Sequence, residues 1–277
     1  FSTEANEDIL NISWMSGASK IPFFPADDYP ALPELGDMAI SATFPSPILL
    51  TGINNTIYAT AEDEIRPVMN GIFFDMTPES TTLVATDSHK LVYYTRNDVK
   101  AAEKCSFILP KKPAAILRTL LGKSDDIVKV TFDMKNAYFE FEGNILICRL
   151  QEGTYPAYRS VIPKNNPNKL VISRVQLLNA VKRVAVCSNQ STSHVKLSLS
   201  FNKLVISASD TNFSMSAHET LDCSYEGNEM HIGFKSNFLT EILSNLPYEE
   251  VSIELSDPTR AGLILAADET DPEEVIC

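Results

Sequence analysis

The stretch GTYPAYR, residues 153–159, indicates how this chain is organised, because its Tyr-Pro-Ala core also occurs in DDYPALP, residues 27–33. The two tyrosines, Tyr29 and Tyr155, lie 126 residues apart. Each copy follows two short apolar segments and precedes a stretch with helical spacing of apolar residues. Self-similarity at a fixed spacing indicates a repeated structural unit. The sequence therefore predicts the end of one unit followed by two nearly complete ones.

The composition is that of a globular protein. Of the 277 residues, 44% are hydrophobic and 21% are charged, with a formal net charge of −13, which suits about two domains rather than disorder or fibre. The five cysteines form no CxxC pair, so we expect a reducing, cytoplasmic location and no metal or other cofactor. No apolar run is long enough to span a membrane, and the polar start FSTEANEDIL predicts no signal peptide.

Apolar spacing predicts the same order of elements twice: helix, strands, helix, strands. In the second unit, Ser173 and Gln176 have the spacing of a capping box at a helix start. In the first unit, the second helix is expected to present Ile116, Leu117, Leu120 and Leu121 on one face. The predicted segments are a helix at 46–61, strands within 71–95, a helix at 110–123, strands within 126–150, a helix at 172–190, strands within 195–210, a helix at 235–246 and a hairpin at 249–265.

Positive charge is concentrated on two of these helices. The helix at 110–123 contains Lys111, Lys112, Arg118 and Lys123 with no acid, and the helix at 172–190 contains Arg174, Lys182 and Arg183 with no acid. For any single lysine, a solvated helix face is the simpler interpretation. Two wholly basic helices in so acidic a chain favour a shared positive surface. Nothing in the pattern supplies the Asn, Gln and Arg set that reads base edges, so such a surface would be blind to sequence.

Four segments together resemble a known family: VATDSHKL (84–91), FILPKKP (107–113), EGTYPAYRSVIPKN (152–165) and EMHIGFKSNFLTEIL (229–243). They are similar to the beta subunit of bacterial replicative DNA polymerase, the beta sliding clamps, in register over essentially the whole chain. The resemblance implies an α+β DNA-clamp fold of repeated domains, each with two helices packed on antiparallel β-sheets. On this basis residues 1–36 are the end of domain one, 37–167 are domain two, and 168–277 are domain three without its last residues. The two Tyr-Pro-Ala copies are then the passages from one domain to the next.

The resemblance implies a non-catalytic processivity factor. Family members close as head-to-tail homodimers into a ring around double-stranded DNA, with the helices lining the channel. Topology keeps such a ring on DNA, so modest positive charge that permits sliding is favoured over tight phosphate contacts. Most of domain one is absent here, so this chain by itself is expected to be a fragment that need not close a ring. The channel-facing candidates, chosen by helix placement and charge, are Lys111, Lys112, Arg118, Arg174, Lys182, Arg183 and Lys235.

The family also implies a groove between domains two and three that binds linear peptides of the replicative polymerase, the clamp loader and repair proteins. The matching positions here are Arg66, Val68, Met69, Thr86, Ser88, His89, Lys90, Leu91, Pro156, Ser160 and Val161. Their apolar members suit a Leu-Phe type anchor, although each alone would be read as a core residue.

Several groove positions depart from the family pattern. Family members often carry Gly at the position of Ser88, Arg at Lys90 and Ser160, and aromatic residues at 67 and 68. The family chain also continues past Cys277 with a Met-Pro-Met-like end that lines the groove.

Two alternatives belong to other classes of function. A peptide-binding scaffold would bind the same peptides without any dependence on DNA topology. A small hydrolase would use His89, since Asp87 lies two residues earlier and would share its face on a strand, where a carboxylate can orient a histidine. No nucleophile elbow, phosphate-binding loop or metal-spaced set accompanies this pair, and His194, His218 and His231 are isolated. Catalysis is therefore disfavoured.

Overall fold

The computed structural model describes residues 2–6, 8–36, 38–63, 65–122, 125–268 and 274–276. The chain forms two compact units, Phe1–Gly36 and Asp37–Cys277. The first unit contains a three-stranded antiparallel meander, β1 (Ser2–Asn6), β2 (Ile9–Trp14) and β3 (Gly17–Pro22), and the short 3-10 helix η1 (Ala26–Asp28). Tyr29 of the first Tyr-Pro-Ala copy follows η1 and is 78% exposed.

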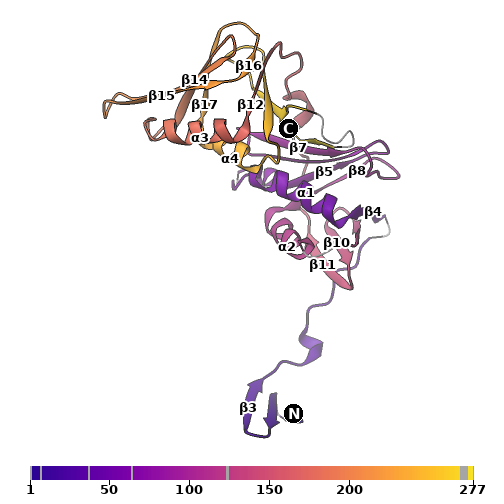
Figure 1. The fold of residues 1–277 in the computed structure, drawn as a ribbon. Helices are drawn as coiled ribbons and strands as arrows, with labels where there is room; N and C mark the ends of the chain where they lie inside the picture. Colours follow the sequence, from indigo (N-terminus) through magenta and orange to yellow (C-terminus); the bar gives the residue numbers. More distant parts are fainter. Residues whose placement is uncertain are drawn as a thin grey trace. The chain divides into compact units, whose positions relative to one another are not determined.

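The second unit begins with one complete helix-and-strand repeat (Figure 1). Its strands form a four-stranded sheet in the order β11-β10-β9-β4 and, together with β20 (Glu274–Ile276) from the end of the chain, a five-stranded sheet in the order β20-β7-β6-β5-β8. The elements of this repeat are β4 (Ile40–Pro45), α1 (Ser46–Thr56), η2 (Ile57–Ala59), η3 (Pro67–Met69), β5 (Gly71–Met76), β6 (Thr81–Thr86), β7 (Leu91–Arg96), β8 (Cys105–Pro110), α2 (Lys111–Leu121), β9 (Ile127–Phe132), β10 (Asn136–Phe141), β11 (Asn144–Arg149) and η4 (Tyr158–Ser160).

A second repeat follows with the same connectivity. In both repeats the strand before the first helix pairs with the strand after the second helix, β4 with β9 and β12 with β18. In both, the strands after the first helix and before the second also pair, β5 with β8 and β13 with β17. Its elements are β12 (Asn168–Ser173), α3 (Arg174–Ala185), β13 (His194–Ser200), β14 (Lys203–Asp210), β15 (Met215–Asp222), β16 (Ser224–Tyr225), β17 (Met230–Lys235), α4 (Ser236–Asn245), β18 (Glu250–Leu255), β19 (Leu263–Ala266) and β20 (Glu274–Ile276).

Strand β20 connects the two repeats. It follows the second repeat in sequence, but it pairs antiparallel with β7 of the first, with Glu274 opposite Arg96 and Ile276 opposite Tyr94. The backbone hydrogen bonds of this pairing cover one edge of the five-stranded sheet. The apolar core is also shared, because one continuous cluster includes Phe74 and Leu117 of the first repeat together with Leu197 and Leu243 of the second.

The helix boundaries follow local sequence signals. Helices α1 and α2 each begin directly after a proline, and the side chain of Ser173 caps α3 by accepting a hydrogen bond from the backbone N–H of Gln176 at 3.5 Å. The expected apolar face of α2 is only half correct. Leu117 and Leu121 are fully buried beside Ala114, whereas Ile116 and Leu120 are exposed. Ala114, Leu117 and Leu121 are spaced by three and four residues and therefore share the buried face of the helix. Ile116 and Leu120 consequently point away from that face.

Candidate functional site

A cavity of about 640 Å³ lies between the two repeats of the second unit, a volume within the range of ligand sites. The first repeat contributes η3, the β6–β7 turn and residues 156–163; the second contributes side chains of β17, α4 and β19. Of the groove positions expected from the sequence, only Val68 is not among the lining residues, and it packs against a cluster that contains Tyr155 and Tyr158. The lining includes Arg66, Met69, Thr86, Ser88, His89, Lys90, Leu91, Pro156, Ser160 and Val161.

The β6–β7 turn presents three of these residues, Ser88, His89 and Lys90, and Asp87 organises it. The Asp87 carboxylate accepts hydrogen bonds from the backbone N–H groups of His89 and Lys90, both at 2.9 Å. Asp87 and His89 therefore do not share a strand face as expected; they lie in a turn, where an aspartate satisfies the backbone donors that follow it. The carboxylate binds the backbone of His89, so the arrangement is that of a turn and not of an acid–base pair.

Ser88 occupies a position that favours glycine. Its φ of 76° lies in the left-handed region, which costs a residue with a Cβ more than it costs glycine. Its backbone N–H donates to Thr86 Oγ1 at 3.1 Å, and its hydroxyl lies 3.5 Å from Met69 Sδ. The guanidinium of Arg66 donates a hydrogen bond to the Ser88 hydroxyl. The serine thus links two groove-lining segments that a glycine would leave unconnected.

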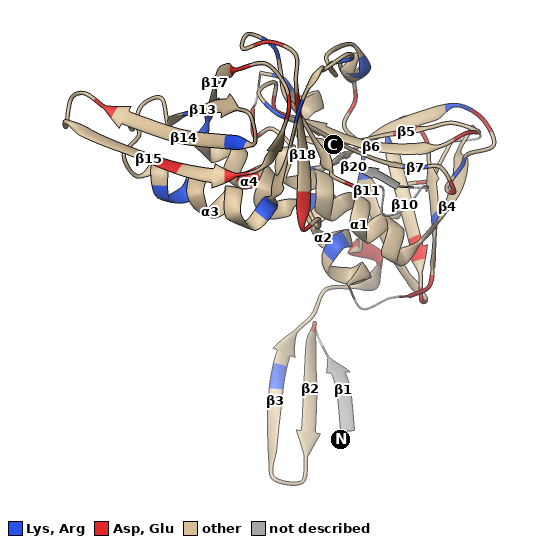
Figure 2. Ribbon diagram, turned by 45° about the horizontal axis from the view of Figure 1, so that its top comes forward, with Lys and Arg blue, Asp and Glu red and all other residues tan. Residues whose placement is uncertain are grey.

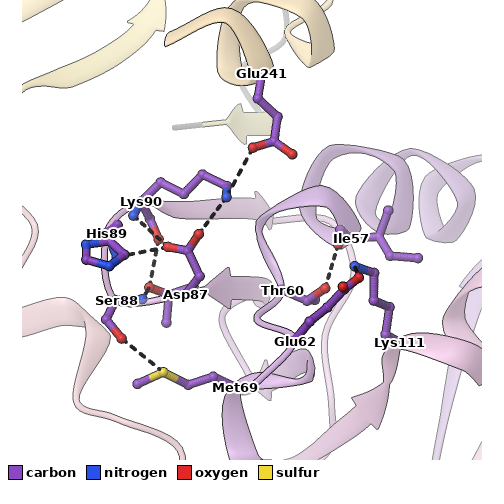
Figure 3. Close-up of polar contacts among 11 residues, drawn as sticks. Ile57, Thr60, Glu62, Met69, Asp87, Ser88, His89, Lys90, Lys111 and Glu241 are labelled. Atoms are coloured by element: carbon purple, nitrogen blue, oxygen red, sulfur yellow. Dashed lines mark hydrogen bonds and ion pairs between the residues drawn. The ribbon is translucent and has the colours of Figure 1, made fainter. Parts of the chain in front are cut away.

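Lys90 joins the two repeats electrostatically. Its Nζ lies 2.6 Å from Asp87 Oδ2 and 3.1 Å from Glu241 Oε2 of α4, while only 8% of its side chain is exposed (Figure 3). Burial alone would lower the pKa of Lys90, but the hydrogen bonds to Asp87 and Glu241 outweigh it, and the pKa lies above its usual value. Lys90 is therefore a fixed positive charge in the groove wall, already matched by two carboxylates.

Phe238 of α4 lies beside this ion pair. The His89 ring stacks on it with centroids 5.7 Å apart and an interplanar angle of 20°. The Nζ atoms of Lys90 and Lys235 lie 5.2 and 5.4 Å from the centroid of the same ring, within the range of cation–π attraction. Lys235, predicted from the sequence to face the DNA channel, is among the residues that line this cavity.

Two tyrosine side chains, Tyr155 and Tyr158, hold residues 156–163 of the groove wall in place. The ring of Tyr155 stacks on Phe73 at 4.6 Å and 4°. The Tyr158 hydroxyl donates to Asp75 at 2.8 Å, and Arg159 donates to the same carboxylate oxygen at 3.0 Å. Buried Asp75 thereby fixes the segment, while Val161, 64% exposed, remains at the surface of the cavity.

The contribution of the second repeat to this cavity was not predicted from the sequence. No groove role was predicted for Phe238 and Ile242 of α4 or for Leu263 and Ile264 of β19, yet all four line it. The available signal was the segment EMHIGFKSNFLTEIL, whose resemblance to the family extends over the residues of α4 that line the cavity.

The predicted channel residues have different surroundings. Lys112, Arg118 and Lys182 are exposed on α2 and α3, where Figure 2 shows the blue segments of these helices. Lys111 forms an ion pair with Glu62 at 2.6 Å, and Arg183 donates to Glu219 at 2.9 Å. Lys123 lies outside the described residues.

Arg174 has a structural role. Its guanidinium donates to the carbonyl oxygens of Tyr248 and Leu243, at 2.6 and 2.8 Å. Leu243 lies in the last turn of α4, so Arg174 satisfies a carbonyl that the end of the helix leaves without an intrahelical partner.

None of the helices in the described part of the chain has the length and apolar composition needed to cross a membrane.

Comparison with known proteins gives a consistent result. Residues 43–157 match the model of the DNA polymerase III beta subunit central domain, and residues 159–277 match that of its C-terminal domain. The beta sliding clamp of Proteus mirabilis is 30% identical over 258 residues, which cover 92% of this chain and 70% of that protein. The beta sliding clamp of Escherichia coli K12 is 30% identical over 244 residues, 87% of this chain and 66% of that protein.

Solved structures show the same likeness. The DNA polymerase III subunit beta of Pseudomonas aeruginosa has a TM-score of 0.91 and 25% identity, covering 99% of this chain and 74% of that chain. A sliding clamp from Bartonella birtlesii, solved bound to griselimycin, has a TM-score of 0.87 and 26% identity over the same shares. The chain thus spans about two thirds of the length of these curated relatives.

Proposed function

Because this chain belongs to the DNA polymerase III beta subunit family, the beta sliding clamps, we propose that the cavity between its repeats binds linear peptide segments of proteins that work on DNA. The family is one of non-catalytic DNA sliding clamps, so the chain is a clamp and not an enzyme. The partners proposed for the groove are the replicative polymerase, the clamp loader and repair proteins. We further propose that residues 1–36 end domain one, 37–167 form domain two and 168–277 belong to domain three.

The observation that carries the proposal is the composition of the cavity lining. Met69, Leu91 and Val161 from the first repeat face the same space as Ile242 and Leu263 from the second. Apolar anchors of a short peptide gain most of their binding energy by filling such a pocket. The hydroxyl and cationic side chains around it provide hydrogen bonds that orient the peptide backbone and polar groups.

A second part of the proposal concerns DNA. Lys112, Arg118 and Lys182 are exposed on helices, and we assign them to a sliding surface for duplex DNA inside the ring of the intact homodimer. The exposed ion pairs of Lys111 and Arg183 are weak enough to exchange for phosphate contacts. Arg174, which is hydrogen-bonded to the backbone, and Lys235, which lines the groove, are omitted from this surface.

The test is a titration of a fluorescein-labelled Gln-Leu-Ser-Leu-Phe peptide, followed by anisotropy. Leu91→Asp and Val161→Asp should each weaken binding more than about tenfold, because both place a charge where an apolar anchor docks. Val161 is mostly exposed, so its substitution should leave folding intact. Leu32→Asp, the same chemical change at an exposed site of the first unit, is the control.

Two results would contradict the groove assignment. One is the absence of saturable binding by the unaltered chain, and the other is binding that survives both Leu91→Asp and Val161→Asp. The alternative, a peptide-binding scaffold that does not encircle DNA, is distinguished by whether the intact homodimer is retained on nicked circular DNA. A clamp that encircles DNA is released when the circle is linearised, whereas a surface-bound scaffold is not.

A further inference from the structure

We infer that Lys235 makes the groove selective for peptides that carry a carboxylate beside their apolar anchors. The inference rests on the proposed peptide-binding function and names the class of peptide. Lys235 is the last residue of β17, and Ser236 begins α4 directly after it. Its backbone pairs with His194 of β13, so its position is set by the sheet and by the helix start together.

The other Lys and Arg side chains of the cavity lining already have carboxylate partners. Lys90 lies between Asp87 and Glu241, and Arg66 lies 3.5 Å from Asp63. Among the cavity-lining Lys and Arg residues that the structure describes, Lys235 alone has no ion pair, and its ammonium group lies over the Phe238 ring. A cation–π contact at an exposed site is weaker than a carboxylate contact that is partly shielded from water. The ammonium group of Lys235 is therefore the donor that a ligand carboxylate gains most by reaching.

The same charges restrict where an acidic group is accepted. Near Lys90, an incoming carboxylate meets one positive charge and the two negative charges of Asp87 and Glu241, which makes that position unfavourable. Near Lys235 it meets a cation without a carboxylate partner. Discrimination between peptides thus arises from attraction at one position and repulsion at another, which is how specific interfaces separate similar ligands. A second acidic residue in the wrong place should cancel the benefit of the first.

The competing assignment for Lys235 is the one made from the sequence, a lysine that faces DNA. It predicts that removing the charge weakens DNA association and leaves every peptide affinity unchanged. The placement of Lys235 in the cavity lining, with its ammonium group over Phe238, supports the peptide role. The two assignments therefore differ in which ligand responds to the substitution.

The experiment measures Kd by anisotropy for four C-terminally amidated, fluorescein-labelled peptides. The neutral parent is Gln-Leu-Asn-Leu-Phe, and the others carry one acid each: Glu-Leu-Asn-Leu-Phe, Gln-Leu-Asp-Leu-Phe and Gln-Leu-Asn-Leu-Phe-Asp. Each is titrated against the unaltered chain, Lys235→Met and Lys196→Met. Lys196 is an exposed lysine on β13 of the same sheet, outside the cavity lining, and serves as the matched control.

At least one acidic peptide should bind the unaltered chain about fivefold more tightly than the neutral parent. This gain should disappear in Lys235→Met, remain in Lys196→Met, and shrink when NaCl is raised from about 0.05 M to about 0.5 M. The readout is the ratio of the Kd of the neutral parent to the Kd of each acidic peptide, so a loss of affinity that Lys235→Met causes equally in every peptide does not count as a loss of selectivity.

Equal affinities for the neutral and all acidic peptides would overturn the inference, and so would a gain that persists in Lys235→Met. In both cases the neutral parent still binds, and the proposed groove stands. If no peptide binds the unaltered chain, the proposed function fails along with the inference.

Discussion

Substituting Tyr158 by phenylalanine removes one hydroxyl group from beneath the groove wall. That hydroxyl donates a hydrogen bond of 2.8 Å to Asp75, whose carboxylate is buried against the five-stranded sheet. Burial raises the pKa of Tyr158, so the hydroxyl remains a protonated donor at neutral pH. In the variant, Asp75 keeps only its contact with Arg159, whose side chain is 65% exposed.

The expected loss of stability follows from these contacts. A hydrogen bond to a charged group contributes about 1.5–3 kcal/mol, and a buried acceptor that loses a donor costs a similar amount. Because Arg159 still offers a donor at 3.0 Å, we expect the lower part of this range, about 1.5–2 kcal/mol. For a unit of this size, that corresponds to a fall in Tm of about 3–8 °C.

The assay is urea denaturation followed by far-UV circular dichroism. Tryptophan fluorescence is unsuitable, because the only tryptophan, Trp14, lies in the N-terminal unit. The midpoint should fall without a change in the slope m. The control is Tyr29→Phe at the exposed tyrosine of the first Tyr-Pro-Ala copy, expected to change stability by less than about 0.5 kcal/mol. Equal stability of the Tyr158 and Tyr29 variants would refute the reasoning that a buried hydroxyl–carboxylate bond fixes the groove wall.

Three further outcomes are expected. Leu117→Ala should destabilise the protein by about 2–4 kcal/mol in urea denaturation, because Leu117 is fully buried. Ile116→Ala, on the exposed face of the same helix, should cost less than about 1 kcal/mol. Similar losses in the two variants would contradict the assigned helix face. Gly71→Ala should destabilise by about 1–3 kcal/mol in the same assay, since a Cβ there would lie 2.5 Å from a backbone carbonyl oxygen. For Asp87, burial alone would raise the pKa, but its hydrogen bonds to Lys90 and the turn backbone lower it. The stability that ionised Asp87 contributes is thus present above about pH 4 and lost below it. The difference in free energy of unfolding between the unaltered chain and Asp87→Asn should therefore disappear in acid. A difference that does not depend on pH would be inconsistent with the lowered pKa.

Much of the fold was predictable from local patterns. The repeated Tyr-Pro-Ala passages and the alternating apolar spacing predicted two similar units, and the structure has the same strand pairing in both. The predictions of the α+β clamp fold and of a DNA sliding clamp are confirmed by the family and the structural neighbours. The roles proposed for individual groove and channel residues remain predictions.

The predictions that failed involved the orientation of side chains. Asp87 and His89 were placed on a strand because two-residue spacing fits one, but hydrogen bonding of the carboxylate to the next backbone N–H groups makes a turn instead. Ile116 and Leu120 were predicted to share one apolar face with Leu117 and Leu121, because all four fit helical spacing. Such local patterns show which faces of a helix or strand could be buried. They do not show which of these faces packs against another element.

The repeated architecture and the family could be predicted from the sequence, because both depend on periodicity and on motifs that are contiguous in the chain. The surroundings of each cation could not, because they depend on the tertiary structure. Lys90 is matched by Glu241, Arg174 by backbone carbonyls, and Lys235 lines the cavity over Phe238. The surroundings of a charge depend on elements that are distant in sequence and adjacent in space. Two lysines that look equivalent in the sequence therefore differ in the structure: Lys90 is paired with two carboxylates, and Lys235 lies over the Phe238 ring in the cavity lining.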